Sequence, residues 1–417
     1  MAQRRPVHRP LRHGPRPLPM HLISHVSTLM GSHVALPLLR SGSLPWVPGL
    51  ADKARALKES LDAGGADAYD RLAREVVIEG LARHEGFLAG VEAYRRHPYH
   101  RALPPPPVLK TAGTTRLVDY RDPARPGGVP VLVIPSLVNR AYILDLMANR
   151  SVLRYFASHG LAPFLVEWDA PGDEENGFGL TDYVAGRLEW ALDAVLAETG
   201  QAPALLGYCM GGLLALALAH RRPEAVRSLV LLATPWDFHV GREAHGMMMK
   251  ALSGPLGQLL DRLGMVPVDM LQTLFSGLDV TLAPRKFASF ARLKQRSARA
   301  RDFVALEDWA NDGVPLAGPV ARECLFGWYG DNAPALGKWE IAGRAVRPEE
   351  VAVPALVVVP ERDRIVPPES ALPLADALAN AKLMKTRGGH VGMLLTRRAR
   401  TDVYGPIAKW LVRASTQ

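Results

Sequence analysis

The chain has 417 residues, of which 48% are hydrophobic and 22% charged, and its formal net charge is +9. This length suits one large α/β domain with insertions or two domains, and the hydrophobic fraction supplies a sizeable core. No uninterrupted apolar run reaches the roughly 18 residues of a membrane-spanning helix, and the start lacks a secretory signal pattern, so we expect no transmembrane segment and no secretion.

The chain contains two cysteines, Cys209 and Cys324. So few in a chain of this size favour a reducing, cytoplasmic compartment over a disulfide framework. The excess of basic residues favours anionic partners without specifying one.

The first third of the chain is predicted to be a basic arm followed by helices. Residues 1–48 are rich in arginine and proline, and we expect a flexible arm there. Residues 49–107 form a predicted helical region, with apolar side chains at helical spacing across 66–94. The proline run at 104–107 marks its end.

From residue 108 onward, short apolar runs alternate with helical patterns. Such alternation predicts an α/β fold with a mostly parallel, doubly wound sheet. The predicted strands are 131–134, 163–167, 204–206, 229–233, 355–359 and 383–385, and the predicted helices are 152–159, 182–198, 213–220, 370–380 and 401–412. Residues 108–238 and 347–417 are therefore the two parts of a core, and residues 239–346 are a predicted lid inserted between them.

The most informative motif follows the third of these strands. Gly207-Tyr208-Cys209-Met210-Gly211 matches the nucleophile elbow Gly-x-Ser-x-Gly of the α/β-hydrolase fold, with cysteine in place of serine. The glycines allow a strained turn, and the helix that follows points its N-terminus at the sulfur, which favours the thiolate. A buried structural cysteine is the alternative.

Partners for this nucleophile follow the last two predicted strands. Asp363 lies in the loop after the first of them, and His390 lies among glycines after the second. The chain order Cys209, Asp363, His390 is that of nucleophile, acid and base in this fold. Asp237 is the rival acid, and a turn or packing role remains open for both Asp363 and His390.

Sulfur suits acyl transfer between thioesters, because the acyl group moves from one thioester to another at nearly constant free energy. We predict that the Met210 N–H stabilises the oxyanion. A second N–H is expected from the loop 135–139, and we assign it to Val138. No phosphate-binding loop, dinucleotide fingerprint or zinc spacing occurs, so we predict no cofactor and no metal site.

With these residues, the chain resembles the polyhydroxyalkanoate synthases, particularly the class III catalytic subunits. The elbow is similar to their cysteine lipase box, and Glu167-Trp168-Asp169 is similar to their Asp-Trp-Gly segment. The similarity extends over roughly residues 108–414, through segments at 137–146, 180–184, 234–238, 306–309, 341–344 and 389–392.

The resemblance implies a synthase that polymerises 3-hydroxyacyl-CoA through an acyl group on Cys209, activated by His390. It implies that Asp363 helps to activate the 3-hydroxyl of the incoming substrate. We assign Asn139 and Trp236, which lie in the similar segments, and His239, at the entrance of the predicted lid, to substrate binding. The implied partners are the CoA thioester, the polyester chain or granule surface, and a second synthase subunit or a second copy of the chain.

Two other functions remain open. A hydrolase with a cysteine nucleophile (a thioesterase, a depolymerase or a dienelactone-hydrolase-like enzyme) would share the elbow, and access of water distinguishes it from a synthase. A non-catalytic protein could instead bind granules or nucleic acid through the basic arm and the basic stretch 285–301. We expect that stretch to be a solvated helix face, so nucleic acid is the less favoured partner.

Overall fold

The computed structural model describes residues 12–125, 127–241 and 243–415. The chain divides into two compact units. The helical unit comprises Met1–His100 and Gln272–Asn311, and the sheet unit comprises Arg101–Leu271 and Asp312–Gln417. The insertion predicted at 239–346 is therefore divided, because its middle part belongs to the helical unit.

The sheet unit is built on a central sheet that has eight strands in the described residues. Their order is β1-β2-β6-β3-β7-β8-β13-β14. Neighbours from β6 to β14 are parallel, whereas β1 and β2 add an antiparallel edge that the sequence did not predict. The bounds are β1 Val108–Ala112, β2 Thr115–Asp119, β3 Val129–Ile134, β6 Leu161–Glu167, β7 Ala204–Tyr208, β8 Ser228–Leu232, β13 Ala355–Pro360 and β14 Ala381–Thr386.

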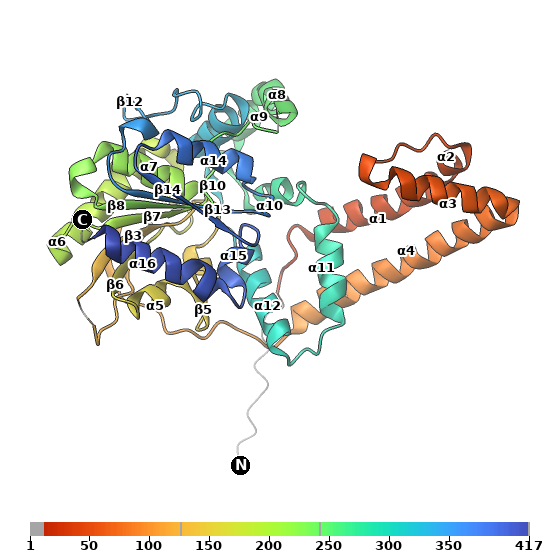
Figure 1. Ribbon diagram of the computed structural model, residues 1–417, viewed down its shortest axis with the longest axis horizontal. Coiled ribbons are helices and arrows are strands. Elements are labelled where there is room, and N and C mark those ends of the chain that lie inside the picture. The colour runs from red at the N-terminus through yellow and green to blue at the C-terminus, as the bar shows by residue number, and fades with distance from the viewer. Residues whose placement is uncertain (1–11, 126, 242, 416–417) are drawn as a thin grey trace, which may run out of the picture. The chain divides into compact units, whose positions relative to one another are not determined.

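Helices cover both faces of this sheet (Figure 1): α5 and α16 lie on one face, and α7 and α14 on the other. The central strands are consequently buried on both sides, which explains their continuous apolar sequences. The predicted mostly parallel, helix-covered sheet is confirmed. The bounds are α5 Val152–Ala157, α6 Glu189–Thr199, α7 Met210–Arg221, α14 Pro368–Ala377 and α16 Gly405–Ala414, and π-helical turns η4 Asp182–Leu188 and η8 Arg400–Tyr404 precede α6 and α16.

Shorter elements complete the sheet unit. Those from the predicted lid are α8 Glu243–Ala251, α9 Ser253–Leu263, β9 Met265–Val266, β10 Leu316–Ala317, α13 Gly318–Arg322, the π-helix η6 Glu323–Gly330 and the hairpin β11 Glu340–Ile341 with β12 Arg344–Ala345. Between β3 and α5 lie η2 Ala141–Leu144, β4 Asp145–Met147 and β5 Arg150–Ser151, and α15 Gly392–Leu395 follows β14.

The helical unit packs around the long helix α4. Its bounds are α1 Leu18–Val34, α2 Leu36–Ser41, α3 Ala51–Ala63, α4 Gly65–Arg96, α11 Leu282–Ala291 and α12 Ala298–Asn311, and α10 Val268–Ser276 spans the boundary between the two units. Phe87 of α4 and Phe287 of α11 are completely buried together. The two helices can approach closely because Gly90 has no side chain. A Cβ at this position would lie 2.0 Å from the carbonyl oxygen of Phe287.

The structure corrects the flexible arm predicted for residues 1–48. Residues 18–41 form α1 and α2, whereas residues 1–11 lie outside the described part of the chain. Among the described residues, one helical stretch, Leu18–Ser41, is long and apolar enough to cross a membrane by length and composition, and 11% of it is buried. Length and composition are weak evidence by themselves, because signal sequences and the buried core helices of soluble proteins pass the same test.

Candidate active site

Cys209 lies in a strained turn between β7 and α7. Its backbone angles are φ 57° and ψ −127°, a region that L-residues other than glycine rarely adopt. The Cys209 N–H donates to the carbonyl oxygen of Leu232 at 2.9 Å, which ties the turn to the neighbouring strand β8. The side chain is half-buried at the N-terminal end of α7.

The glycines around Cys209 are required by close backbone contacts. A Cβ at Gly207 would lie 2.4 Å from the Cα of Gly212. A Cβ at Gly211 would lie 2.1 Å from the carbonyl oxygen of Ile134, at the end of β3. Any side chain at either position would push the elbow away from the sheet, so these contacts explain the spacing of the motif.

The structure brings His390 and Asp363 together beside this turn. His390 Nδ1 lies 2.7 Å from Asp363 Oδ2, with the two side chains 7% and 0% exposed. Asp363 Oδ1 accepts hydrogen bonds from the N–H groups of Ile365 and Val366, both at 2.9 Å. Both carboxylate oxygens are therefore engaged, and this fixes the orientation of the imidazole.

Cys209 lies close enough to His390 to raise the pKa of the imidazole. Burial alone would lower the pKa of His390, but the charge of Cys209, hydrogen bonds to Asp363 and Cys209, and the charge of Asp363 together raise it to about 10. An imidazole with these partners stabilises a negative charge on the sulfur.

Tyr208 contacts His390 through both its hydroxyl and its ring. Its hydroxyl donates to the carbonyl oxygen of His390 at 3.2 Å, and its ring stacks on the imidazole with centroids 5.2 Å apart. Burial raises the pKa of Tyr208 well above its usual value, with contributions from the charges of Cys209 and Asp363. The hydroxyl therefore stays protonated and keeps its donor role.

The rival acid, Asp237, has a different set of partners. Its Oδ1 accepts hydrogen bonds from the N–H groups of His239 and Val240 and from the side-chain amide of Asn332. These bonds make Asp237 the anchor of the turn that leaves the sheet after β8. The carboxylate that faces His390 is that of Asp363.

The two predicted oxyanion donors differ in their surroundings. Met210 is the first residue of α7, so its N–H has no acceptor within the helix. The N–H of Val138 donates to the Ser136 hydroxyl at 3.2 Å, and its carbonyl accepts from the N–H of Val314 at 3.4 Å. The Val138 N–H is therefore already engaged by a side chain of its own loop.

Two of the three predicted substrate-binding residues are held by contacts within the protein. Asn139 takes part in a backbone bridge, and Trp236 is buried in the core. Asn139 pairs with Gly313 in an antiparallel bridge, and its side-chain carbonyl is buried without a hydrogen-bond partner in the described part of the chain. The Trp236 side chain is 5% exposed and belongs to the hydrophobic core, and the backbone N–H of Trp236 donates to the carbonyl oxygen of Ser370 at 3.0 Å.

The third, His239, lies at a cavity of about 640 Å³. Its Nε2 is 3.0 Å from the carbonyl oxygen of Tyr329 in η6. Other lining residues are Met247, Lys250 and Lys338, whereas Cys209, Asp363 and His390 do not line the cavity. The structure thus groups His239 with the lid elements rather than with the cysteine.

Both cysteines are free, and Cys324 is buried in η6. Burial raises the pKa of Cys324 well above its usual value, and the charge of Glu323 adds to the effect, so this thiol is unreactive. Within the described ranges, no group of three or more His, Cys, Asp or Glu side chains could hold a metal ion.

Sequence reasoning missed the supporting roles of Tyr208 and Ser136. Tyr208 lies inside the elbow motif, and alternation along β7 could have placed its side chain on the face opposite its neighbours. Ser136 gave no signal, because its bond to the Val138 N–H depends on the local conformation of a loop.

Comparison with known proteins identifies the fold family. A family model described as the alpha/beta hydrolase fold matches residues 129–395. The chain belongs to the α/β-hydrolase fold family. As an α/β hydrolase by fold, it carries Cys209 at the position where this family places its nucleophile.

Within this family, the similar curated proteins are poly(3-hydroxyalkanoate) polymerase subunits named PhaC. The subunit from Haloarcula marismortui is 30% identical over 293 residues, which cover 69% of this chain and 62% of that protein. The subunit from Synechocystis sp. is 29% identical, covering 68% of this chain and 77% of that protein. The subunit from Allochromatium vinosum is 27% identical, covering 68% and 80%.

These relatives confirm the resemblance to the polyhydroxyalkanoate synthase family. The chain spans 62% of the length of the Haloarcula marismortui subunit and 59% of a further PhaC subunit, from Haloferax mediterranei, to which it is 29% identical.

Proposed function

We propose that this chain is an acyltransferase that polymerises 3-hydroxyacyl groups from CoA thioesters into a polyester. The contact of Cys209 with an imidazole that is oriented by Asp363 carries the proposal. The relatives named poly(3-hydroxyalkanoate) polymerase support the choice of reaction.

In the first step, the Cys209 sulfur, whose proton His390 already holds, attacks the thioester carbonyl carbon. A new carbon–sulfur bond forms, the bond to the CoA sulfur breaks, and CoA leaves with the proton from His390. The Met210 N–H stabilises the oxyanion that forms on the carbonyl oxygen. The Val138 N–H joins it once Ser136 has released this group.

In the second step, the 3-hydroxyl oxygen of another 3-hydroxyacyl-CoA attacks the acyl group on Cys209. His390 accepts the hydroxyl proton as the Cys209 sulfur departs, so that an ester forms and the starting state of the pair is restored. The extended acyl-CoA then returns its chain to Cys209 as in the first step. Asp363 acts here through His390, because both of its oxygens are already engaged.

The competing reaction is hydrolysis, in which water replaces the 3-hydroxyl in the second step. Transfer to an alcohol requires that water be kept from the acyl group on Cys209. The predicted acyl-CoA substrate needs no metal or organic cofactor for either step. The polyester surface and a second subunit or second copy of the chain are further proposed partners.

The experiment compares wild type, Cys209→Ala and Cys324→Ala with 3-hydroxybutyryl-CoA. We expect wild type and Cys324→Ala to release CoA and to form polymer, and Cys209→Ala to do neither. Free thiol and polymer are measured in the same reaction. Release of CoA with monomeric 3-hydroxybutyrate as the only product identifies a hydrolase, and undiminished turnover by Cys209→Ala refutes the proposed nucleophile.

A further inference from the structure

We propose that Arg140, Asp169 and Asp312 form an ionic latch that positions the oxyanion loop, residues 136–140, for catalysis. The latch holds this loop against the return segment, residues 312–314, where the chain re-enters the sheet unit. Its catalytic role rests on the proposed function of the Val138 N–H. Its structural role can be tested without any substrate.

The guanidinium of Arg140 bridges two carboxylates from distant parts of the sequence. Its Nη1 lies 2.8 Å from Asp169 Oδ1, and its Nε lies 3.1 Å from Asp312 Oδ1. Asp169 follows β6, and Asp312 begins the return segment. One planar cation thus joins the strand end, the oxyanion loop and the return segment.

Backbone pairing reinforces the same junction. Asn139 and Gly313 form an antiparallel bridge, and the Val314 N–H donates to the carbonyl oxygen of Val138 at 3.4 Å. The peptide that follows the Val138 N–H is therefore held by the return segment. Asp312 is therefore connected to the Val138 N–H, the predicted oxyanion donor, through the backbone bonds of Gly313 and Val314.

Asp169 occupies a backbone conformation that favours glycine. Its φ is 59°, in the left-handed region, which costs a non-glycine residue on the order of 1 kcal/mol. Its carboxylate also accepts from the Ala170 N–H at 2.8 Å and lies 3.6 Å from Arg116 Nη2. Glycine would adopt this backbone conformation without strain. The aspartate therefore indicates that the carboxylate, which contacts two arginines, is needed at this position.

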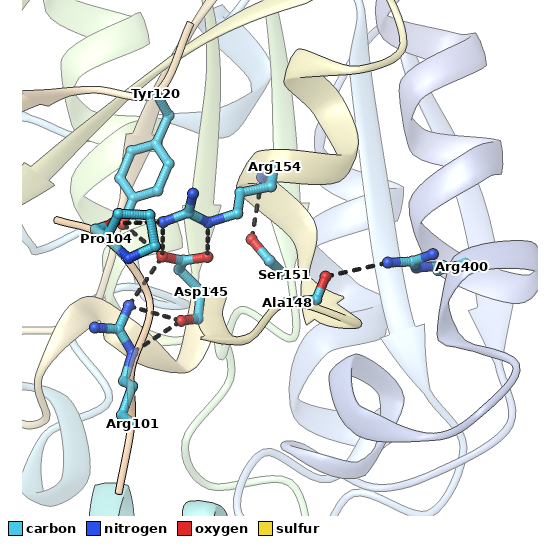
Figure 2. A network of polar contacts seen from close by, with 8 residues as sticks. All are labelled: Arg101, Pro104, Tyr120, Asp145, Ala148, Ser151, Arg154 and Arg400. Atoms are coloured by element: carbon cyan, nitrogen blue, oxygen red, sulfur yellow. Dashed lines mark hydrogen bonds and ion pairs between the residues drawn. The ribbon is translucent and has the colours of Figure 1, made fainter. Parts of the chain in front are cut away.

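The oxyanion loop begins the segment that joins β3 to α5. Farther along this segment, Asp145 is held by a separate cluster of polar contacts (Figure 2). Asp145 is fully buried and accepts hydrogen bonds from Arg101, Arg154 and Tyr120. Arg154 also donates to the carbonyl oxygen of Pro104. Residue 145 is thus held by contacts that do not involve the latch.

The decisive variant is Asp169→Gly, because it relieves backbone strain while it removes the carboxylate. We expect its thermal midpoint to equal or exceed that of wild type, with kcat for CoA release lowered about 10-fold and KM changed less than about twofold. Arg140→Gln should lower kcat similarly. Arg140→Lys should recover only part of the loss. Lysine keeps the positive charge, but its ammonium cannot bridge both carboxylates in one plane.

The second readout is amide hydrogen exchange of residues 136–140. Exchange there should quicken in Asp169→Gly and Arg140→Gln, while the amides of α7 keep their protection. The matched control is Arg222→Gln, which removes ion pairs with Asp193 and Glu224 at the opposite end of α7. It should leave both kcat and loop exchange unchanged.

The latch is overturned by unchanged exchange of residues 136–140 in both variants, or by unchanged kcat in Asp169→Gly despite faster exchange. A loss of kcat that only follows a lower thermal midpoint also counts against it. If wild type releases no CoA at all, the proposed function has failed, and the exchange data alone then decide whether the latch holds the loop.

Discussion

The segment that joins β3 to α5 is held by ion pairs at both ends, but the two ends differ in exposure. The arginines of the two ends are alike, at 32–33% exposed, but the carboxylate of Asp145 is 0% exposed whereas those of Asp169 and Asp312 are 37% and 48% exposed. A buried charge cluster fixes a conformation because losing one partner strands the others. Exposed ion pairs are weaker and are screened by salt, so they suit a part that has to move.

The largest expected effect concerns the buried carboxylate of the active site. Asp363→Asn should lower kcat by about 10²- to 10⁴-fold, because an amide cannot accept from His390 and from the two loop N–H groups at once. Asp237→Asn is the matched control and should change kcat by less than about threefold. CoA release measures both, and the opposite ranking of the two variants would transfer the role of acid to Asp237.

The next effect is on stability and separates the two ends of the segment directly. Asp145→Ala should lower the free energy of unfolding by about 3–5 kcal/mol, because Arg101 and Arg154 lose their shared buried partner. Asp312→Ala should lower it by less than about 1 kcal/mol. Urea denaturation measures the difference. Equal losses in the two variants would contradict the contrast between a fixed end and an adjustable end.

Most of the sheet unit was predictable from the sequence. Strands buried on both faces read as continuous apolar runs, so β3, β7, β8 and β13 were identified within about two residues. β1 was missed because most of its residues are exposed, which removes the apolar signal. The composition of residues 1–48 predicted flexibility, but the apolar stretch within it forms α1 and α2.

The chain order of Cys209, Asp363 and His390 was readable because each follows a strand whose end lies at the same edge of the sheet. Contacts between distant segments were not readable. Arg140 and Asp312 are 172 residues apart in sequence. The pairing of α4 with α11, which divides the predicted lid, likewise depends on tertiary packing that no local pattern encodes.

A smaller effect tests the buried side of the contrast by pH. The pKa of His390 is raised from 6.5 to about 10 in the folded protein, so its protonated form stabilises the fold. That contribution is complete below pH 6.5 and is lost as the pH rises toward about 10. The stability difference between wild type and His390→Gln should therefore shrink across this range.

Cys209→Ala is the control for this pH dependence. It removes the charge that contributes most to raising the pKa of His390, so the loss of stability should begin at a lower pH. Urea denaturation at several pH values measures both variants. A wild-type curve that coincides with that of Cys209→Ala would show that the sulfur does not carry the charge that holds the imidazolium.

The smallest effect tests the exposed side by ionic strength. Raising the salt concentration from about 0.05 M to about 0.5 M shortens the screening length and weakens ion pairs at the surface more than buried ones. We expect kcat for CoA release to fall by about twofold in wild type and to stay unchanged in Arg140→Gln, which has no latch left to screen.

The quantity to measure is kcat at saturating substrate, because the phosphates of CoA make KM depend on salt in every variant. The free energy of unfolding should respond to salt by less than about 1 kcal/mol more in wild type than in Arg140→Gln, because exposed ion pairs contribute little stability and the buried Asp145 is common to both proteins. The same salt dependence of kcat in Arg140→Gln would place the sensitivity elsewhere in the molecule.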